Sequence, residues 1–270
     1  IDSSFAEGGM AVLYLAHHIS MEREVVVKVM HGDLLYRPEA IERFKRECKF
    51  VARLNHPNII SVYDFGFIAD KQPYLVMEYL KGQSLADHLE DFGSFEVPVA
   101  LKIISQVCYG LEEAHETGII HRDLKPENII LQEKSERPDW VKIVDFGIAH
   151  LLDNTELKRL TRVGFITGTP EYMAPEQFSD KQLDTRCDIY ALGAVLFELL
   201  TGHPPFESED CGALMAKHLL EPPKPISQLR ADIPAGTKIE QIILKCLEKD
   251  PAKRFQKVSD LRRAVEGALS

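Results

Sequence analysis

The segment from Ile119 to Gly147 constrains the fold and chemistry of this chain more than any other part of the sequence. It contains two short apolar runs that suit buried strands, and each run adjoins a cluster of polar residues. Four of these residues fall at strand ends or in adjacent loops, where a rigid scaffold meets solvent: Asp123, Lys125, Asn128 and Asp145. Taken singly, each acid is a plausible solvated loop residue. Together they indicate a divalent metal and a phosphate, because magnesium takes oxygen ligands, usually one or two carboxylates plus substrate phosphates.

The order of residues in this segment resembles the catalytic centre of a protein kinase. It reads His121-Arg122-Asp123-Leu124-Lys125-Pro126-Glu127-Asn128, and Asp145-Phe146-Gly147 follows at a kinase-like distance. Eight consecutive residues and a separate triplet leave chance little room. The chain is similar in particular to bacterial Hanks-type serine/threonine kinases, through Glu7-Gly8-Gly9-Met10 and the later Tyr14-Leu15-Ala16.

The resemblance implies a role for each polar residue of the segment. Asp123 is the base that receives and orients the substrate hydroxyl, and Lys125 neutralises the transferring phosphoryl group. Asn128 and Asp145 hold magnesium, with manganese as an alternative ion. Lys125 also favours a serine/threonine kinase, since tyrosine kinases usually carry alanine and arginine in this segment. His121 is expected to brace the loop.

A glycine-containing turn near the start of the chain is the expected phosphate-covering loop. Glycine lets backbone N–H groups approach phosphates closely, although a Gly-Gly pair also suits an ordinary hairpin turn. Only one of the family's three glycines is present, because Ala6, Gly8, Ala11 and Leu13 occupy the key positions. Alanine is a mild replacement, so we expect ATP binding to survive. The resemblance gives nucleotide contacts to Ala6, Gly8, Gly9, Met10, Ala11 and Leu13.

Lys28 and Glu47 are expected to form an ion pair. Met10 to Ala16 and Glu24 to Met30 predict a β-hairpin with Lys28 facing inward on its second strand. Pro38 to Leu54 predicts a helix that carries Glu47 on its apolar side. An unpaired buried charge is costly, with ~3–5 kcal/mol the usual penalty for breaking such a pair, so Glu47 requires a cation. The alternatives are a solvent-facing Lys28 and a solvated Glu47. In the resemblance, this pair holds the ATP phosphates.

The segment Met77-Glu78-Tyr79-Leu80 is the expected hinge. The resemblance makes Met77 the gatekeeper and gives the backbone of Glu78 and Leu80 hydrogen bonds to adenine. Three apolar residues would sandwich the ring, as in a mostly apolar pocket with few polar groups: Leu13, Val26 and Ile130.

A polar, threonine-containing loop between Gly147 and Ala174 is the expected regulatory segment. We expect autophosphorylation at Thr161 first and Thr167 second, with Arg122 as the partner of the added phosphate. The alternative at each position is an unmodified surface threonine. Thr169 precedes Pro170-Glu171-Tyr172-Met173-Ala174-Pro175-Glu176, and it is expected to position the substrate.

The remaining sequence predicts two more strands followed mainly by helices. The strands are Ile59 to Phe67 and Pro73 to Met77; the helices are a short one capped by Ser84, then Val97 to Thr117, Asp188 to Thr201, Ile239 to Leu247 and Val258 to Leu269. The helix from Asp188 to Thr201 is apolar nearly all round and should be buried. By resemblance, Glu176 pairs with Arg254, and Asp188 holds the backbone of the catalytic loop.

Bulk properties describe an ordinary globular chain of 270 residues, with 45% hydrophobic and 27% charged residues. A net charge of −10 argues against nonspecific binding to nucleic acid or anionic membranes. Five cysteines, an odd number without a Cys-x-x-Cys pair, predict buried free thiols in a reducing compartment. No apolar run reaches the ~20 residues of a membrane span, and no signal peptide opens the chain. We therefore expect a cytoplasmic domain without membrane contact, either independent or the cytosolic part of a larger, membrane-anchored protein.

The sequence as a whole predicts an α+β protein with a two-lobed kinase fold. We expect residues 1–80 to form a small antiparallel β-sheet lobe with one helix and a clipped first strand, and residues 81–270 to form a larger, mainly helical lobe. We expect a protein serine/threonine kinase that uses MgATP and protein substrates, and the resemblance adds the idea of a homodimer through the small lobe. Two alternatives remain: a pseudokinase acting as a nucleotide-binding or docking module, and a small-molecule kinase, which the Ala174-Pro175-Glu176 segment disfavours.

Overall fold

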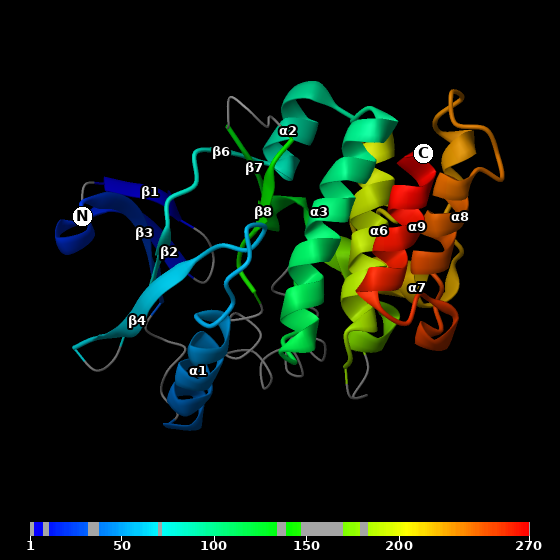
Figure 1. Ribbon diagram of the computed structural model, residues 1–270. Helices are drawn as coiled ribbons and strands as arrows, with labels where there is room; N and C mark the ends of the chain where they lie inside the picture. The colour runs from blue at the N-terminus through cyan, green and yellow to red at the C-terminus, as the bar shows by residue number, and fades with distance from the viewer. Residues whose placement is uncertain are drawn as a thin grey trace.

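The computed structural model describes residues 3–7, 11–31, 38–69, 72–133, 139–146, 170–178 and 183–269, with backbone only at 3–7, 38–40, 43 and 47. Within these ranges the chain forms a sheet-rich part and a larger helical part (Figure 1). The α+β, two-lobed prediction is confirmed. The chain leaves the first sheet at Glu78 and enters a second one at Gly82. The lobe boundary after residue 80 stays a prediction.

The small lobe is built on a five-stranded antiparallel sheet in the order β1-β2-β3-β5-β4. Its strands are β1 (Ser3–Glu7), β2 (Ala11–His18), β3 (Arg23–Met30), β4 (Val62–Ile68) and β5 (Gln72–Glu78). The predicted hairpin is confirmed, with Leu13 opposite Lys28. The strand before the glycine-containing turn is present for five residues and pairs with β2.

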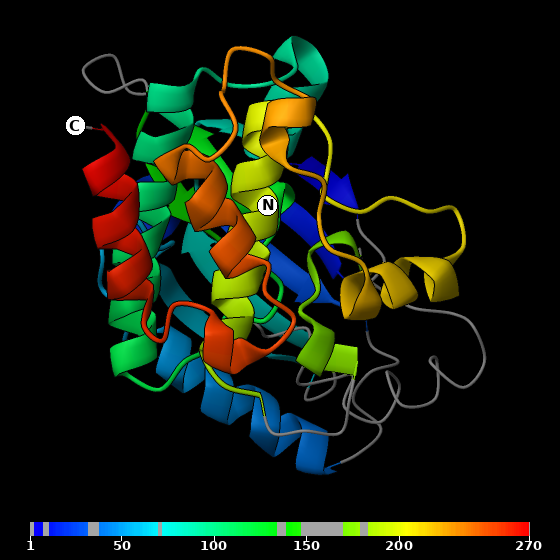
Figure 2. The same ribbon diagram turned by 90° about the vertical axis from the view of Figure 1, so that its right-hand side faces the viewer.

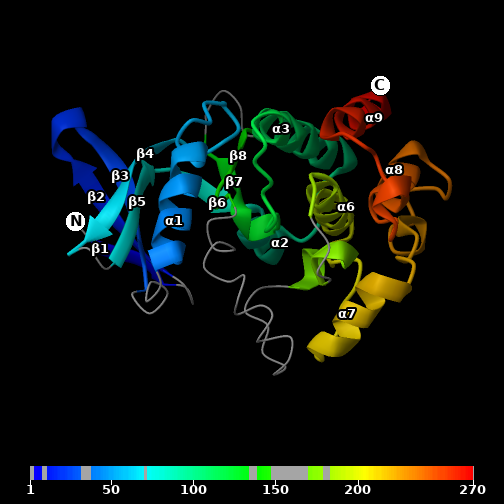
Figure 3. The same cartoon turned by 90° about the horizontal axis from the view of Figure 1, so that it is seen from below.

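Helix α1 (Pro38–Val51) packs against this sheet, as Figure 3 shows. Its buried residues Phe44 and Cys48 join a cluster with Val26 and Met30 of β3 and Leu75 of β5. The period of the apolar residues in α1 therefore sets which face meets the sheet.

The strand predicted from Ile59 was placed too early, because β4 begins at Val62. Ile59 instead forms an isolated parallel bridge with Ile143 and is almost fully buried. The apolar character of Ile59 and Ile60 thus serves the contact between the lobes, which a period-two pattern cannot distinguish from a sheet strand.

The larger lobe is organised around two long helices, α3 (Val97–Glu116) and α6 (Arg186–Thr201). Nearly every residue of α6 is buried, as its all-round apolar sequence predicts. Figure 2 shows α8 and α9 alongside them. Among the described residues, this lobe also contains the α-helices α2 (Leu85–Phe92), α7 (Cys211–Leu220), α8 (Lys238–Cys246) and α9 (Val258–Leu269). It contains as well a sheet of β6 (Gly82–Ser84), β7 (Ile129–Gln132) and β8 (Val141–Ile143).

Local signals fix the ends of these helices. Ser84 caps α2 in a capping box with Asp87, whose backbone N–H donates to Ser84 Oγ over 3.0 Å. Thr237 caps α8, and Gly202 ends α6 with a left-handed φ of 79°. All five cysteines are free thiols, as predicted, but Cys211 is only half-buried. Within the described residues, no helix combines the length and apolarity needed to cross a membrane.

Candidate active site

The loop of residues 121–128 between α3 and β7, called the catalytic loop below, brings three predicted site residues together. Asn128 Nδ2 donates to the Asp123 carbonyl oxygen over 2.7 Å and to its carboxylate Oδ2 over 3.1 Å. Lys125 Nζ lies 3.7 Å from Asp123 Oδ2. Asn128 is buried, whereas the Asp123 side chain keeps 27% of its surface exposed. The carboxylate is therefore oriented from the interior and still open to a substrate group.

Asp188, near the start of α6, holds the backbone of this loop. Its two carboxylate oxygens accept from the N–H groups of His121 and Arg122, each over 2.9 Å, and His115 Nε2 lies 2.8 Å away. Burial opposes ionisation of Asp188, but His115 and the Arg122 N–H hold its pKa below the usual value. A charged, buried carboxylate thus fixes the loop, in agreement with the role implied for it.

His121 braces the loop from the other side. It is fully buried, its Nε2 lies 2.9 Å from the Val144 carbonyl oxygen, and its ring packs 4.7 Å from that of Phe146. These contacts connect the catalytic loop to the Asp145-Phe146 segment.

Asp145 follows β8 in a left-handed conformation with φ of 59°. Such a backbone costs about 1–3 kcal/mol in a non-glycine residue and is concentrated at functional sites. Its Oδ1 accepts from Lys28 Nζ over 2.7 Å. Partial burial favours the neutral acid, but the ammonium of Lys28, with help from His121 and Lys125, lowers the pKa of Asp145. Lys28 therefore faces inward, as predicted.

The predicted pair of Lys28 and Glu47 is not tested, because the Glu47 side chain lies outside the described residues. The ion pair that the structure places at Lys28 is the one with Asp145. Sequence periodicity gave Lys28 its inward direction but did not indicate this partner.

Most of the expected adenine-contacting side chains gather in one apolar cluster. Val26 and Met77 are buried in it, and Leu13 and Leu80 pack against it half-buried. Ala11 is a further buried member. Ile130 lies on β7, opposite Lys142 of β8 and Ser84 of β6. Ala6 is described by backbone alone and pairs with Leu13, while Gly8, Gly9 and Met10 lie outside the described residues.

A buried ion pair behind the hinge was not predicted. Lys142 Nζ donates to the Ile59 carbonyl oxygen over 3.1 Å and to the carboxylate of Glu78, which also accepts from Ser61 N over 2.7 Å. This contact joins the hinge to the strand that leads into Asp145. The signal available in the sequence was a single lysine within the apolar run Val141 to Val144.

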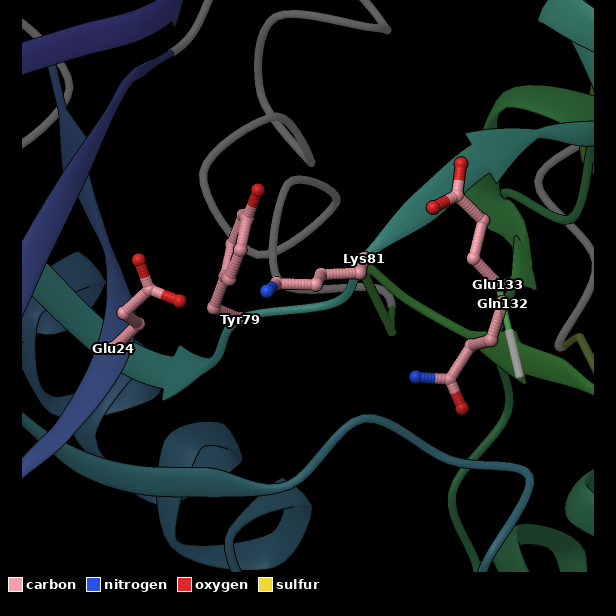
Figure 4. Close-up of a pocket in the computed structure, with 5 residues that line it drawn as sticks. All are labelled: Glu24, Tyr79, Lys81, Gln132 and Glu133. Carbon is pink, nitrogen blue, oxygen red and sulfur yellow. The ribbon is translucent and has the colours of Figure 1, made fainter. Parts of the chain in front are cut away.

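A separate pocket of about 320 Å³ lies at the connector between the two sheets (Figure 4). Tyr79 and Lys81 come from the connector, Glu24 from β3, and Gln132 with Glu133 from the end of β7. None of these five residues belongs to the predicted nucleotide or catalytic set.

Asn128 and Asp145 are the residues that fit a magnesium ion. The amide nitrogen of Asn128 donates its hydrogen bonds to Asp123, so the amide oxygen of Asn128 is the atom available to ligate a cation. The described residues contain no group of three or more His, Cys, Asp or Glu side chains suited to a metal. An ion here would therefore depend on few protein oxygens together with phosphates, the usual shell of magnesium.

Three threonines with predicted roles lie outside the described residues: Thr161 and Thr167, expected to be regulatory, and Thr169, expected to position the substrate. Arg122 is described, and its Nε is buried without a hydrogen-bond partner among the described residues. The predicted ion pair of Glu176 with Arg254 is present, with both Arg254 terminal nitrogens bonded to the carboxylate at 2.7 and 2.8 Å.

Comparisons with known proteins agree on one family. The family model described as "Protein kinase domain" matches residues 2–264. The serine/threonine-protein kinase pkn3 of Myxococcus xanthus is 44% identical over 255 residues, which cover 94% of this chain and 47% of pkn3. The chain spans less than half the length of the curated relatives it matches.

Two solved structures show the same fold. The crystal structure of Rad53 1-466 in complex with AMP-PNP has a TM-score of 0.79 at 25% identity, covering 97% of this chain and 63% of that one. The PknI kinase domain of Mycobacterium tuberculosis has a TM-score of 0.77 at 27% identity, covering 98% and 94%.

Proposed function

This chain belongs to the protein kinase family, and we propose that it transfers the γ-phosphoryl group of MgATP to serine or threonine hydroxyls of protein substrates. The observation that carries the proposal is the cluster at Asp123, which accepts hydrogen bonds from Asn128 and forms an ion pair with Lys125. Asp188 holds the backbone of this loop, and Lys28 pairs with Asp145 nearby. Its relatives are named as serine/threonine-protein kinases, which favours turnover over a pseudokinase.

Each residue of this group has a task in the proposed reaction. Asp123 orients the acceptor hydroxyl and takes its proton, while Lys125, 3.7 Å away, offsets the charge of the transferring phosphoryl group. Lys28 binds the phosphates of the nucleotide. Asn128 and Asp145 would hold magnesium, which supplies charge neutralisation between the β- and γ-phosphates when bound.

The apolar cluster of Leu13, Val26, Met77 and Leu80 supports adenine binding next to the hinge. A related fold has been crystallised with the ATP analogue AMP-PNP, in the Rad53 structure, and this supports the same ligand class here. Backbone groups of Glu78 and Leu80 would bond the base, and the turn at Ala6 to Ala11 would cover the phosphates.

We propose further that Arg122 receives a phosphate added to Thr161 or Thr167 by autophosphorylation. The buried Arg122 Nε without a described partner supports this role, since a phosphothreonine supplies about −1.5 to −2 charge and three acceptor oxygens. Intact-mass analysis after incubation with MgATP, with the sites mapped, tests it. An active enzyme without phosphate on either threonine would contradict it.

A homodimer through the small lobe is a related proposal. The candidate contact residues are Ile19 and Ile68, large apolar side chains that are 86% and 47% exposed on that lobe. Sedimentation of the wild type and of the double variant Ile19→Ser with Ile68→Ser tests it, and a wild type that stays monomeric at high concentration would exclude it.

We place the domain on the cytosolic side of the cell, which the free thiols support.

The decisive experiment for the phosphotransferase compares the wild type with Asp123→Asn. Both are incubated with labelled ATP and a generic basic protein, and nucleotide binding is measured in parallel. We expect label transfer by the wild type, a loss of roughly 10²–10⁴-fold in the variant, and ATP binding by both. Equal silence of both proteins with ATP still bound would favour the pseudokinase.

A further inference from the structure

Gln177 makes two hydrogen bonds that join two segments of the larger lobe. It lies in the short helical turn η5 (Pro175–Phe178) and is half-buried. Its amide Nε2 donates to the Arg122 carbonyl oxygen over 2.9 Å. Its Oε1 accepts from the Ala174 N–H, also over 2.9 Å. One side chain therefore contacts the backbone of both the catalytic loop and the Ala174 segment.

The first bond acts on the residue that directly precedes the catalytic base. Arg122 has a left-handed φ of 67°, a conformation that costs a non-glycine residue about 1–3 kcal/mol and needs support from its surroundings. Asp188 accepts from its N–H, and Gln177 donates to its carbonyl oxygen. Loss of the second contact would free the Arg122 carbonyl oxygen, while the Asp123 N–H still donates to His121 Nδ1 over 3.3 Å and Asn128 still donates to the Asp123 carboxylate.

The second bond acts on the segment expected to contact the protein substrate. Ala174 is fully buried, and the neighbouring Glu176 is anchored by Arg254, whose side chain has no exposed surface. The segment thus has a rigid attachment to the lobe and a direct attachment, through Gln177, to the catalytic loop.

We propose that Gln177 is a positioning residue that sets the register between the substrate-binding segment and Asp123. The inference rests on the proposed function. The Ala174 segment would place the hydroxyl of a protein substrate, and Asp123 on the catalytic loop would accept its proton. Transfer to protein therefore requires the two segments to hold a fixed position relative to each other. A misplacement near 1 Å can cost on the order of 10²-fold in rate. Water, which reacts in slow ATP hydrolysis, does not need the substrate-binding segment.

Two variants of the 270-residue chain separate the two bonds. Gln177→Met keeps the side-chain length and removes both bonds, while Gln177→Glu keeps the acceptor for Ala174 and removes the donor to Arg122. For both we expect kcat/KM for a threonine-containing protein substrate to fall roughly 10- to 100-fold. We expect the KM for ATP, ATP hydrolysis without protein substrate, and the melting temperature to stay near wild-type values. Gln177→Glu also provides the test if Gln177→Met does not fold.

Gln241→Met is the matched control, because Gln241 Nε2 also donates to a backbone carbonyl oxygen, that of Gly236, over 2.9 Å. It should leave every readout unchanged. Substrate phosphorylation at the wild-type rate by both Gln177 variants would overturn the inference. A fall in substrate phosphorylation matched by an equal fall in ATP hydrolysis and accompanied by a lower melting temperature would also overturn it, because it would indicate a merely structural role. A wild type that binds ATP but phosphorylates nothing would instead refute the proposed function, and this inference with it.

Discussion

Lys28 Nζ of β3 and Asp145 Oδ1, just beyond β8, lie 2.7 Å apart, so one ion pair joins the sheet of the small lobe to the catalytic segment of the larger lobe. Both side chains keep part of their surface exposed, 20% for Lys28 and 39% for Asp145. The pair is therefore accessible to a nucleotide whose phosphates and cation would be new partners for the two charges.

Replacing Lys28 by methionine should remove this electrostatic contact and the expected phosphate ligand together. We expect phosphorylation of a protein substrate to fall roughly 10²–10³-fold, the usual loss when one such donor is removed. Steady-state kinetics measure it. Lys45→Met is the matched control, because Lys45 pairs with Glu42 at the exposed surface of α1. Comparable losses in both variants would argue against a specific role of Lys28.

Arg254→Ala should destabilise the larger lobe strongly. The arginine is fully buried, forms two hydrogen bonds to Glu176, and also donates to the carbonyl oxygens of Glu248 and Arg186. Its removal takes both of these hydrogen bonds from a largely buried carboxylate, so we expect a loss of about 3–5 kcal/mol in the free energy of unfolding. Denaturant titration measures it.

The control for Arg254 is Arg263→Ala, which breaks an exposed pair with Asp260 on α9. Surface pairs contribute only about 0–1 kcal/mol, so this variant should unfold close to the wild type. Similar losses in the two arginine variants would show that burial of the Glu176 pair is not the cause.

Part of the fold and of the candidate site could be predicted from the sequence alone. The run from His121 to Asn128 identifies the family, and the spacing of apolar residues gives α1, α3 and α6 with ends close to those observed. Local signals such as Ser84 at a helix start depend on neighbours in the chain, so they can be read directly.

Contacts between segments that are far apart in the chain could not be predicted from such local signals. Lys28 is 117 residues from Asp145, and Gln177 is 55 residues from Arg122. The period of a strand gives the face on which a side chain lies but not which polar group meets it across the lobe boundary. Ile59 shows the same limit, because an apolar residue at the interface between lobes resembles the start of a strand.

Lys142→Met should weaken the connection between the hinge and β8. The variant leaves the Glu78 carboxylate, 19% exposed, without its lysine, and the Ile59 carbonyl oxygen without a donor. We expect a loss of unfolding free energy on the order of 3 kcal/mol, and much of it should return in the double variant with Glu78→Gln. A double-mutant cycle in denaturant measures the coupling. Strictly additive losses would show that the two residues do not act as a pair.

His218 should make the stability of the larger lobe sensitive to acid. The imidazole is fully buried on α7, and its Nδ1 lies 2.8 Å from the Tyr190 hydroxyl. Burial, together with the nearby Lys249 ammonium, lowers its pKa to about 4, against about 6.5 in an unfolded chain. Between these values the unfolded state binds the extra proton, so stability falls as the pH drops from about 6.5 to 4.

His218→Asn should remove this dependence while keeping an acceptor near Tyr190. The variant will be less stable than the wild type at pH 7.5, and we expect the difference to shrink by about 2 kcal/mol at pH 5. Glu198, whose pKa burial raises to about 7, loses its contribution as the pH rises from about 4.5 to 7, but it is present in both proteins and cancels in the difference. His203→Asn, at a side chain 72% exposed, is the control for replacing a histidine by asparagine, and its free energy of unfolding should stay close to that of the wild type. Denaturant titrations at the two pH values measure both, and a constant gap for His218→Asn would show that the buried imidazole is not the acid-sensitive group.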